Sequence, residues 1–131
     1  MAVRSSTWRA GADALRALRE ARVHGVEADL EGGHGIPLRS GSCDAVLVFR
    51  FLFRPLAGEI VRVLAPGGLL VYETFTIHQR ELGYGPGNPA FLLEPGELRE
   101  LFAGLAVDHY EEGVFEQPRP MATARLVARR T

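Results

Sequence analysis

Residues 64–74 read LAPGGLLVYET, and this stretch decides the fold. Apolar residues spaced three and four apart between Leu56 and Leu64 predict an amphipathic helix, with Pro55 in its first turn. Pro66, Gly67 and Gly68 end that helix. The apolar run over residues 69–74 then has the length of a buried strand. A helix that turns sharply into a buried strand is typical of α/β proteins.

The segments before this stretch extend the same pattern. Residues 44–49 read DAVLVF, and an apolar run without alternation indicates a strand buried on both faces. This pattern favours a parallel sheet. Further upstream, residues 8–23 predict an amphipathic helix and residues 26–30 a short strand, followed by a glycine-rich loop.

The segments after it close the fold. Residues 77–95 form a long connection rich in Gly and Pro, of a length that usually signals function or mobility. Residues 94–102 predict a helix with Pro95 and Glu97 in its first turn. Residues 106–112 and 122–129 have strand-like content and are close enough to form a hairpin. We therefore predict an α/β fold whose chain ends in an antiparallel hairpin.

Composition limits the classes of protein to which the chain can belong. Its 131 residues and 14.3 kDa suit a single domain, 1–131, and its net charge of −1 provides no surplus for nucleic acid or an anionic membrane. All 15 basic residues are Arg, which excludes a Schiff-base or P-loop lysine. The single Cys43 cannot form an internal disulfide, and the first residues lack the apolar core of a signal peptide. We therefore expect a cytoplasmic protein.

The order of elements resembles that of the class I S-adenosylmethionine-dependent methyltransferases. Four segments carry the likeness: VEADL at 26–30, SCDAVLVF at 42–49, LAPGGLLVYE at 64–73 and the hairpin that ends in ARLVARR at 124–130. NPAFLLEPGEL at 88–98 is similar to the small, tellurite-resistance-type branch. The resemblance implies a Rossmann-like sheet, mostly parallel with a C-terminal antiparallel hairpin. It also implies methylation of a small-molecule substrate with S-adenosyl-L-methionine as cofactor.

Two motifs of that family are absent from the chain. Neither the glycine-rich GxGxG turn after the first strand nor the ribose-binding acid after the second is present, and Arg4 stands near the expected position of the acid. We therefore expect an N-terminally truncated, inactive domain in which the missing central strand leaves an open edge along residues 44–49. A second copy in a homodimer, the missing N-terminal half in trans, or the helix at 8–23 would cover this edge. The alternative function is a non-catalytic methyltransferase-like fragment or a partner-binding module.

Four residues are candidates for contact with the cofactor. By resemblance, Asp29 accepts a hydrogen bond from the adenine amino group, although it is equally well placed to cap the glycine-rich loop, and Leu30 follows it as a further candidate for contact with the cofactor. Phe49 and Arg50 leave the carboxyl end of a buried strand, where α/β sheets place ligands. Arg50 either faces a carboxylate of the cofactor or substrate, or is a strand-end arginine that reaches solvent.

Four further residues are candidates for contact with the substrate. Glu73 and Thr74 end the next strand, so either a substrate contact or a solvated strand end fits them. Tyr84 and Asn88 lie in the long connection that covers the substrate in related enzymes, although Asn88 before a proline is also a natural turn former. We identify no catalytic residue. The four histidines are scattered without metal-ligand spacing, so no metal site is predicted.

Overall fold

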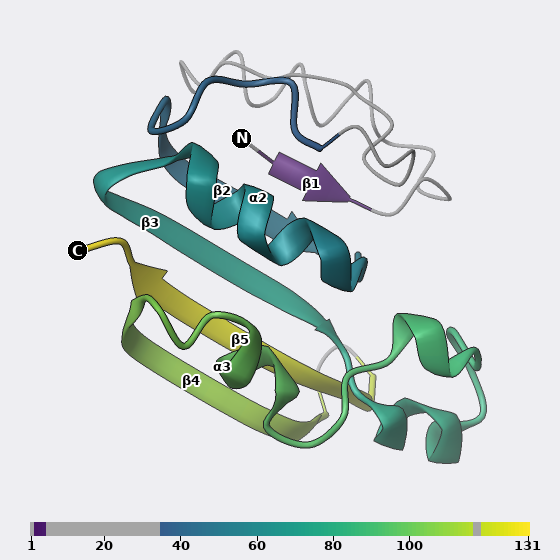
Figure 1. Ribbon diagram of the computed structural model, residues 1–131. Helices are drawn as coiled ribbons and strands as arrows, with labels where there is room; N and C mark the ends of the chain where they lie inside the picture. Colours follow the sequence, from purple (N-terminus) through teal and green to yellow (C-terminus); the bar gives the residue numbers. More distant parts are fainter. Residues whose placement is uncertain (1, 5–34, 117–118) are drawn as a thin grey trace.

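The computed structural model describes residues 2–4, 35–116 and 119–131 (Figure 1). The helix expected at 8–23 and the strand expected at 26–30 lie outside these residues. A five-stranded sheet in the order β1-β2-β3-β5-β4 forms the centre of the described part. Its strands are β1 (Ala2–Arg4), β2 (Cys43–Phe49), β3 (Leu64–Phe75), β4 (Ala106–Phe115) and β5 (Met121–Arg129).

The sheet is mixed, which corrects the expectation of a mostly parallel one. β1 and β3 both run parallel to β2, whereas β5 runs antiparallel to both β3 and β4. The predicted buried strand at 44–49 and the closing hairpin are confirmed. The sheet is mixed because the chain returns from β3 through residues 76–105 and lays the second strand of the hairpin, rather than another parallel strand, against β3.

β1 corrects the expectation of an open edge beside β2. Val3 lies opposite Val48, and Arg4 lies opposite Phe49. The first strand of the chain therefore occupies the place where a gap was expected and covers three residues of the seven-residue β2. The sequence does not predict this strand, because three residues are too few to show the alternation of apolar and polar side chains that marks a strand.

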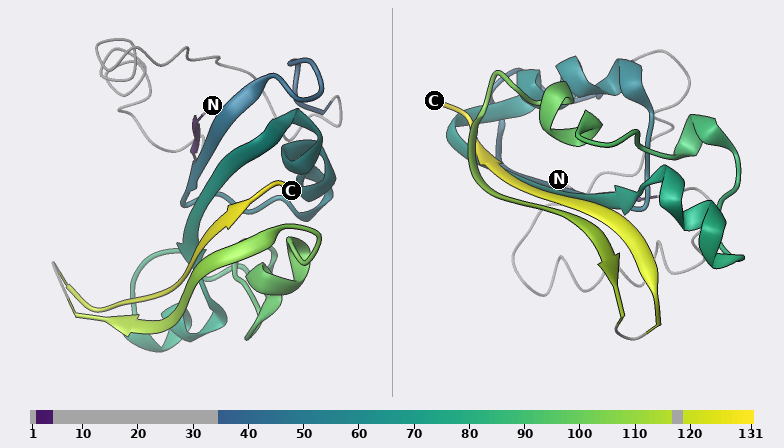
Figure 2. Two further views of the ribbon diagram at one scale, coloured as in Figure 1. Left: turned by 90° about the vertical axis from the view of Figure 1, so that its left-hand side faces the viewer. Right: turned by 90° about the horizontal axis from the view of Figure 1, so that it is seen from below.

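The helical segments are short. They are η1 (Arg54–Leu56), α2 (Ala57–Val63), η2 (Ile77–Leu82), η3 (Pro89–Phe91) and α3 (Glu97–Leu101). α2 and α3 lie on the same face of the sheet (Figure 2), and the main hydrophobic core fills the space between them and the strands. Its fully buried members include Val46, Val48, Ile60, Val63, Leu70, Leu98, Phe102 and Leu126.

The Pro-Gly-Gly run lies inside β3 rather than before it. α2 ends at Val63, β3 begins at once, and the register with β2 jumps from Leu64 to Leu69. The intervening residues bulge out, with Gly67 at a φ of +77°, which favours glycine. A Cβ on Gly68 would lie 2.7 Å from the carbonyl oxygen of Ala65, so only glycine fits there.

Arg130 joins this bulge to the end of α2. Its backbone N–H donates to the carbonyl of Gly68 at 3.0 Å, and its carbonyl accepts from the N–H of Gly67 at 2.7 Å. Its Nη1 donates to the carbonyls of Val61 at 3.1 Å and Leu64 at 2.5 Å. A guanidinium at this position adds a charged donor to carbonyls at the end of α2 and complements the negative end of the helix dipole.

We predict that Arg130→Ala lowers the free energy of unfolding by about 1–2 kcal/mol, because carbonyls at the end of α2 lose a charged donor. Urea unfolding measures the change. Arg129→Ala is the matched control, since the exposed Arg129 pairs only with Asp108 at 2.9 Å and should change stability by less than about 0.5 kcal/mol. Equal losses in the two variants would contradict this role for Arg130.

Candidate functional site

The carboxyl ends of β2 and β3 and the amino end of β5 meet at one edge of the sheet. β2 ends at Phe49, β3 ends at Phe75, and β5, which runs in the opposite direction, begins at Met121. This is the edge at which open α/β sheets bind ligands. Four of the predicted site residues, Phe49, Arg50, Glu73 and Thr74, lie here.

Arg50 has an unusual backbone. Among the described residues it is the single non-glycine residue with positive φ, at +53°, and its N–H donates to the carbonyl of Glu73 at 2.9 Å. The left-handed conformation is uncommon for a residue with a side chain and costs on the order of 1 kcal/mol. It directs the guanidinium toward β3 and β5, where its carbon lies 5.6 Å from the ring centre of Phe75 and its Nη2 lies 3.6 Å from Met121 Sδ.

The residues that follow Arg50 are fixed from the core side. The buried Tyr72 hydroxyl donates to the carbonyl of Phe51 at 2.7 Å. Burial raises the pKa of Tyr72 well above its ordinary value, so the hydroxyl keeps the proton that it donates. Phe51 and Leu52 are themselves buried. The segment after β2 is therefore held at this edge by both its backbone and its side chains.

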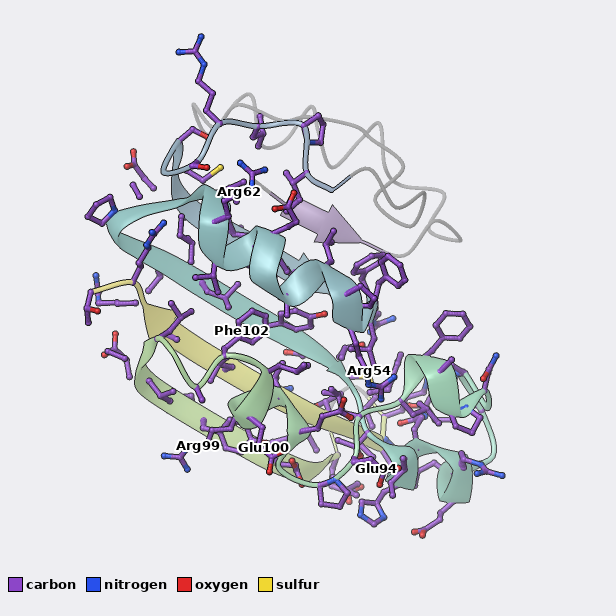
Figure 3. All side chains as sticks on the ribbon, in the orientation of Figure 1. Arg54, Arg62, Glu94, Arg99, Glu100 and Phe102 are labelled. Carbon is purple, nitrogen blue, oxygen red and sulfur yellow. The ribbon has the colours of Figure 1, made fainter. Side chains whose placement is uncertain are left out.

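An ion pair between Arg54 and Glu97 holds the same segment against α3. The Arg54 Nε donates to Glu97 Oε2, and its Nη2 donates to Oε1 at 2.9 Å (Arg54 is labelled in Figure 3). Arg54 also donates to the carbonyls of Ala90 at 3.2 Å and Leu92 at 2.9 Å. Bidentate pairing of this kind is both strong and geometrically specific. Through it, residues 88–97 are fastened to the connection between β2 and α2.

Glu73 and Thr74 face opposite sides of the sheet. Glu73 pairs with Arg125, its register partner on β5, at 3.0 Å, and Arg125 lies 3.8 Å from Glu111 on β4. Thr74 is 2% exposed on the side that α2 and α3 cover. The structure thus brings Glu73 together with charges of the neighbouring strands and does not bring it together with Thr74.

Tyr84 and Asn88 both make contacts within the described structure. The Asn88 side chain accepts from the N–H of Ala90 at 3.0 Å and caps η3. The Tyr84 hydroxyl donates to the carbonyl of Pro120, which joins the long connection to the start of β5. These contacts match the turn-forming alternative considered for Asn88.

Gln79 is a structural residue that sequence reasoning missed. It is fully buried; its Nε2 donates to the carbonyl of Tyr84 at 3.0 Å, and its Oε1 accepts from the N–H of Ala122 at 2.8 Å. Arg54 was also missed, although its partner Glu97 was expected in the first turn of a helix. An amide in a polar connection and an arginine before a proline carry no local signal of the distant groups that they bind.

A small apolar cluster forms the floor of this edge. We call it the edge cluster: Phe75, Leu92 and Met121 are buried, with Ile77 and Tyr84 packed against them. Phe91 lies beside Leu92 in the chain and is 46% exposed, which is high for a large apolar side chain. The edge therefore combines an apolar floor with the guanidinium of Arg50.

The remaining predictions concern Asp29 and Leu30, metal sites and membrane-spanning helices. Asp29 and Leu30 lie outside the described residues. Within the described ranges, no group of three or more His, Cys, Asp or Glu side chains is arranged to hold a metal ion. No helix in that same part of the chain is long and apolar enough to cross a bilayer.

Comparison with known proteins shows the fold. No family model matches the chain, and no curated protein matches its sequence. Solved structures do match, among them TehB from Haemophilus influenzae, with a TM-score of 0.67 and 13% identity over 99% of this chain. A methyltransferase from Mesorhizobium loti has a TM-score of 0.64 and 20% identity over 98% of this chain and 80% of its own. The fold is that of the S-adenosylmethionine-dependent methyltransferases.

The structural similarity covers only part of some of these proteins, and the similar proteins do not all have the same activity. This chain spans 49% of TehB and 65% of the cyclase SpnF, which is similar at a TM-score of 0.64 and 19% identity. A methyltransferase-like fold thus occurs in a protein described as a cyclase, which accords with the general rule that a fold hosts several functions. Function must be argued from the residues at the edge.

We predict that the Arg54–Glu97 pair makes stability depend on acid pH. The hydrogen bond from Arg54 holds the pKa of Glu97 below its ordinary value, so the pair stabilises the folded state above the unfolded pKa and loses this contribution as pH falls through the folded pKa. Between about pH 5 and about pH 3, the free energy of unfolding should fall less in Glu97→Gln than in the natural chain.

Urea unfolding at a series of pH values measures this difference. Glu81→Gln is the matched control, because the exposed Glu81 pairs only with His78 at 3.6 Å and should leave the pH profile unchanged. A Glu97→Gln profile parallel to that of the natural chain would show that the pair does not contribute.

Proposed function

We propose that this chain belongs to an S-adenosylmethionine-dependent methyltransferase that acts on a small-molecule substrate. The observation that carries the proposal is the sheet itself. The parallel strands β1, β2 and β3 and the antiparallel hairpin superimpose on such enzymes over 98–99% of the chain. The sheet edge that would hold ligands combines the edge cluster with the positive charge of Arg50.

The residues beside β2 do not fit the usual cradle for the cofactor. In the family that the sequence resembles, a glycine-rich turn follows the strand at this place in the sheet. Here β1 lies beside β2 and ends at Arg4, opposite Phe49, and the chain continues with Ser, Ser, Thr and Trp at 5–8. None of these is a glycine that would let backbone amides approach a ligand closely. We therefore propose that the chain alone holds the cofactor weakly, and we derive no step of the reaction through it.

What the chain's own residues would supply is alignment and exclusion of water. Methyl transfer is a displacement at one carbon, so positioning the acceptor supplies much of the rate without a dedicated catalytic side chain. We propose that Phe49 and Arg50 face the ligands and that the connection carrying Tyr84 and Asn88 covers the substrate. Glu73 is already paired with Arg125, so a role as proton acceptor would require that pair to open.

The second candidate is a non-catalytic, partner-binding module, which the lack of a glycine-rich turn after β1 favours. For both candidates we propose a principal partner other than nucleic acid or a membrane surface, because a net charge of −1 gives no surplus of positive charge to attract either. We propose a homodimer, or an N-terminal half supplied in trans, as the cover for the residues of β2 that β1 does not pair with.

We predict that calorimetric titration of the chain with S-adenosylmethionine gives little heat and a dissociation constant far above the micromolar range. The reason is that the sequence after β1 has neither the glycine-rich turn nor the ribose-binding acid of the family that it resembles. A dissociation constant in the low micromolar range, about −8 kcal/mol, would contradict this proposal. It would show that other residues of the chain hold the cofactor.

A further inference from the structure

We propose that Arg50 and Thr123 form a subsite for the anionic group of a small molecule, above the apolar floor of the edge cluster. The identity of this molecule as the methyl acceptor rests on the proposed function, whereas binding of the anion itself does not. The ligand class is a small carboxylate with an apolar or aromatic body.

Arg50 is exposed and, among the residues that the structure describes, has no strong acceptor. Its guanidinium carries five N–H donors, and its hydrogen bond among the described residues goes to the thioether of Met121, a weak acceptor. No carboxylate in the described ranges lies within ion-pair distance of it, although six other arginine and histidine side chains there make such pairs. The strained backbone at φ +53° keeps this cation at the edge instead of letting it follow the strand.

Thr123 supplies an independent sign of a ligand. It is 2% exposed, and its hydroxyl has no hydrogen-bond partner within residues 2–4, 35–116 and 119–131. A buried hydroxyl without a partner is costly and calls for an explanation. Thr123 lies on β5 directly opposite Phe75, the residue whose ring lies under the Arg50 guanidinium. Arg50 and Thr123 are therefore both neighbours of Phe75.

The surroundings favour a ligand that is anionic at one end and apolar at the other. A second guanidinium, that of Arg119, lies 3.8 Å from the ring centre of Tyr84, so two arginines stack on aromatic rings of the edge cluster or its margin. Arg119 likewise makes no ion pair with a described residue. By contrast, Arg125 stacks on Phe115 at 4.1 Å but is neutralised by Glu73 and Glu111.

The direction of Arg50 separates this subsite from the cofactor. Its side chain crosses from the end of β2 over β3 to β5, away from β1. We therefore assign Arg50 to the substrate, whereas the sequence analysis placed it among the candidates for contact with the cofactor.

Titration of the full chain with sodium benzoate, followed by amide ¹H–¹⁵N spectra and without cofactor, tests the subsite. We expect benzoate at millimolar concentrations to shift the amides of Arg50, Met121 and Thr123, and we expect neutral benzamide to shift them far less. Arg50→Asn should weaken benzoate binding at least about tenfold, since it removes the charged donor. Asparagine tolerates the left-handed backbone, so this variant should keep the natural melting temperature.

Three further variants complete the experiment. Arg50→Lys should keep part of the affinity, because it keeps the charge but loses the planar fork. Thr123→Val should weaken benzoate binding several-fold without lowering the melting temperature, because the natural hydroxyl has no partner to lose. The matched control Arg129→Gln, at the far end of β5, should bind benzoate as the natural chain does.

Equal shifts with benzamide and benzoate, or unchanged benzoate binding in Arg50→Asn, would overturn the proposal. Because no S-adenosylmethionine is present, this outcome is independent of the cofactor titration. Benzoate binding with no cofactor binding would leave the subsite standing and favour the non-catalytic module. Cofactor binding without benzoate binding would overturn the subsite and favour the methyltransferase.

Discussion

The ion pair between Arg54 and Glu97 is the contact on which the ligand-facing edge depends. It joins groups 43 residues apart in the chain and fastens the connection after β2 to the start of α3. The same guanidinium holds the carbonyls of Ala90 and Leu92, so one side chain positions the whole segment that borders the edge cluster. With Tyr72 bound to the carbonyl of Phe51, it leaves Arg50 on a rigid support, and this rigidity allows the strained backbone of Arg50 to persist.

The two faces of the sheet differ in polarity: one packs against helices, and the other carries charged side chains. α2 and α3 cover one face and bury residues such as Val48, Leu70 and Leu126. On the other face, the centre of β3, β5 and β4 carries the charges of Glu73, Arg125 and Glu111, and the edge cluster lies beyond them. Stability therefore comes mainly from the helix-covered face, and the opposite face keeps polar groups at the edge where ligands would bind.

The local parts of this architecture could be predicted from the sequence, and the distant contacts could not. The apolar run at 44–49, the helix before Pro66 and the closing hairpin are visible because their periods and turn residues are local. The mixed sheet and the placement of Ala2–Arg4 beside β2 depend on which strands pair, and nothing in a three-residue strand specifies its neighbour. Glu73 and Thr74 were predicted together as neighbours, but the strand period of two places them on opposite faces. Arg50 stood out in the sequence as a charge inside an apolar run. Its acceptor, the thioether of Met121, and the buried Gln79 depend on long-range packing.

We propose that the carboxyl edge of β2 and β3 binds the ligands of a methyltransferase. Amide ¹H–¹⁵N spectra of the chain with millimolar S-adenosylhomocysteine, the demethylated cofactor, test it most directly, because they detect weak binding and locate it. We expect the shifts to be concentrated at residues 49–54 and 73–77. The amides of β4, and those of β5 that follow Thr123, should change little. No shifts at all, or shifts centred on the hairpin, would contradict it.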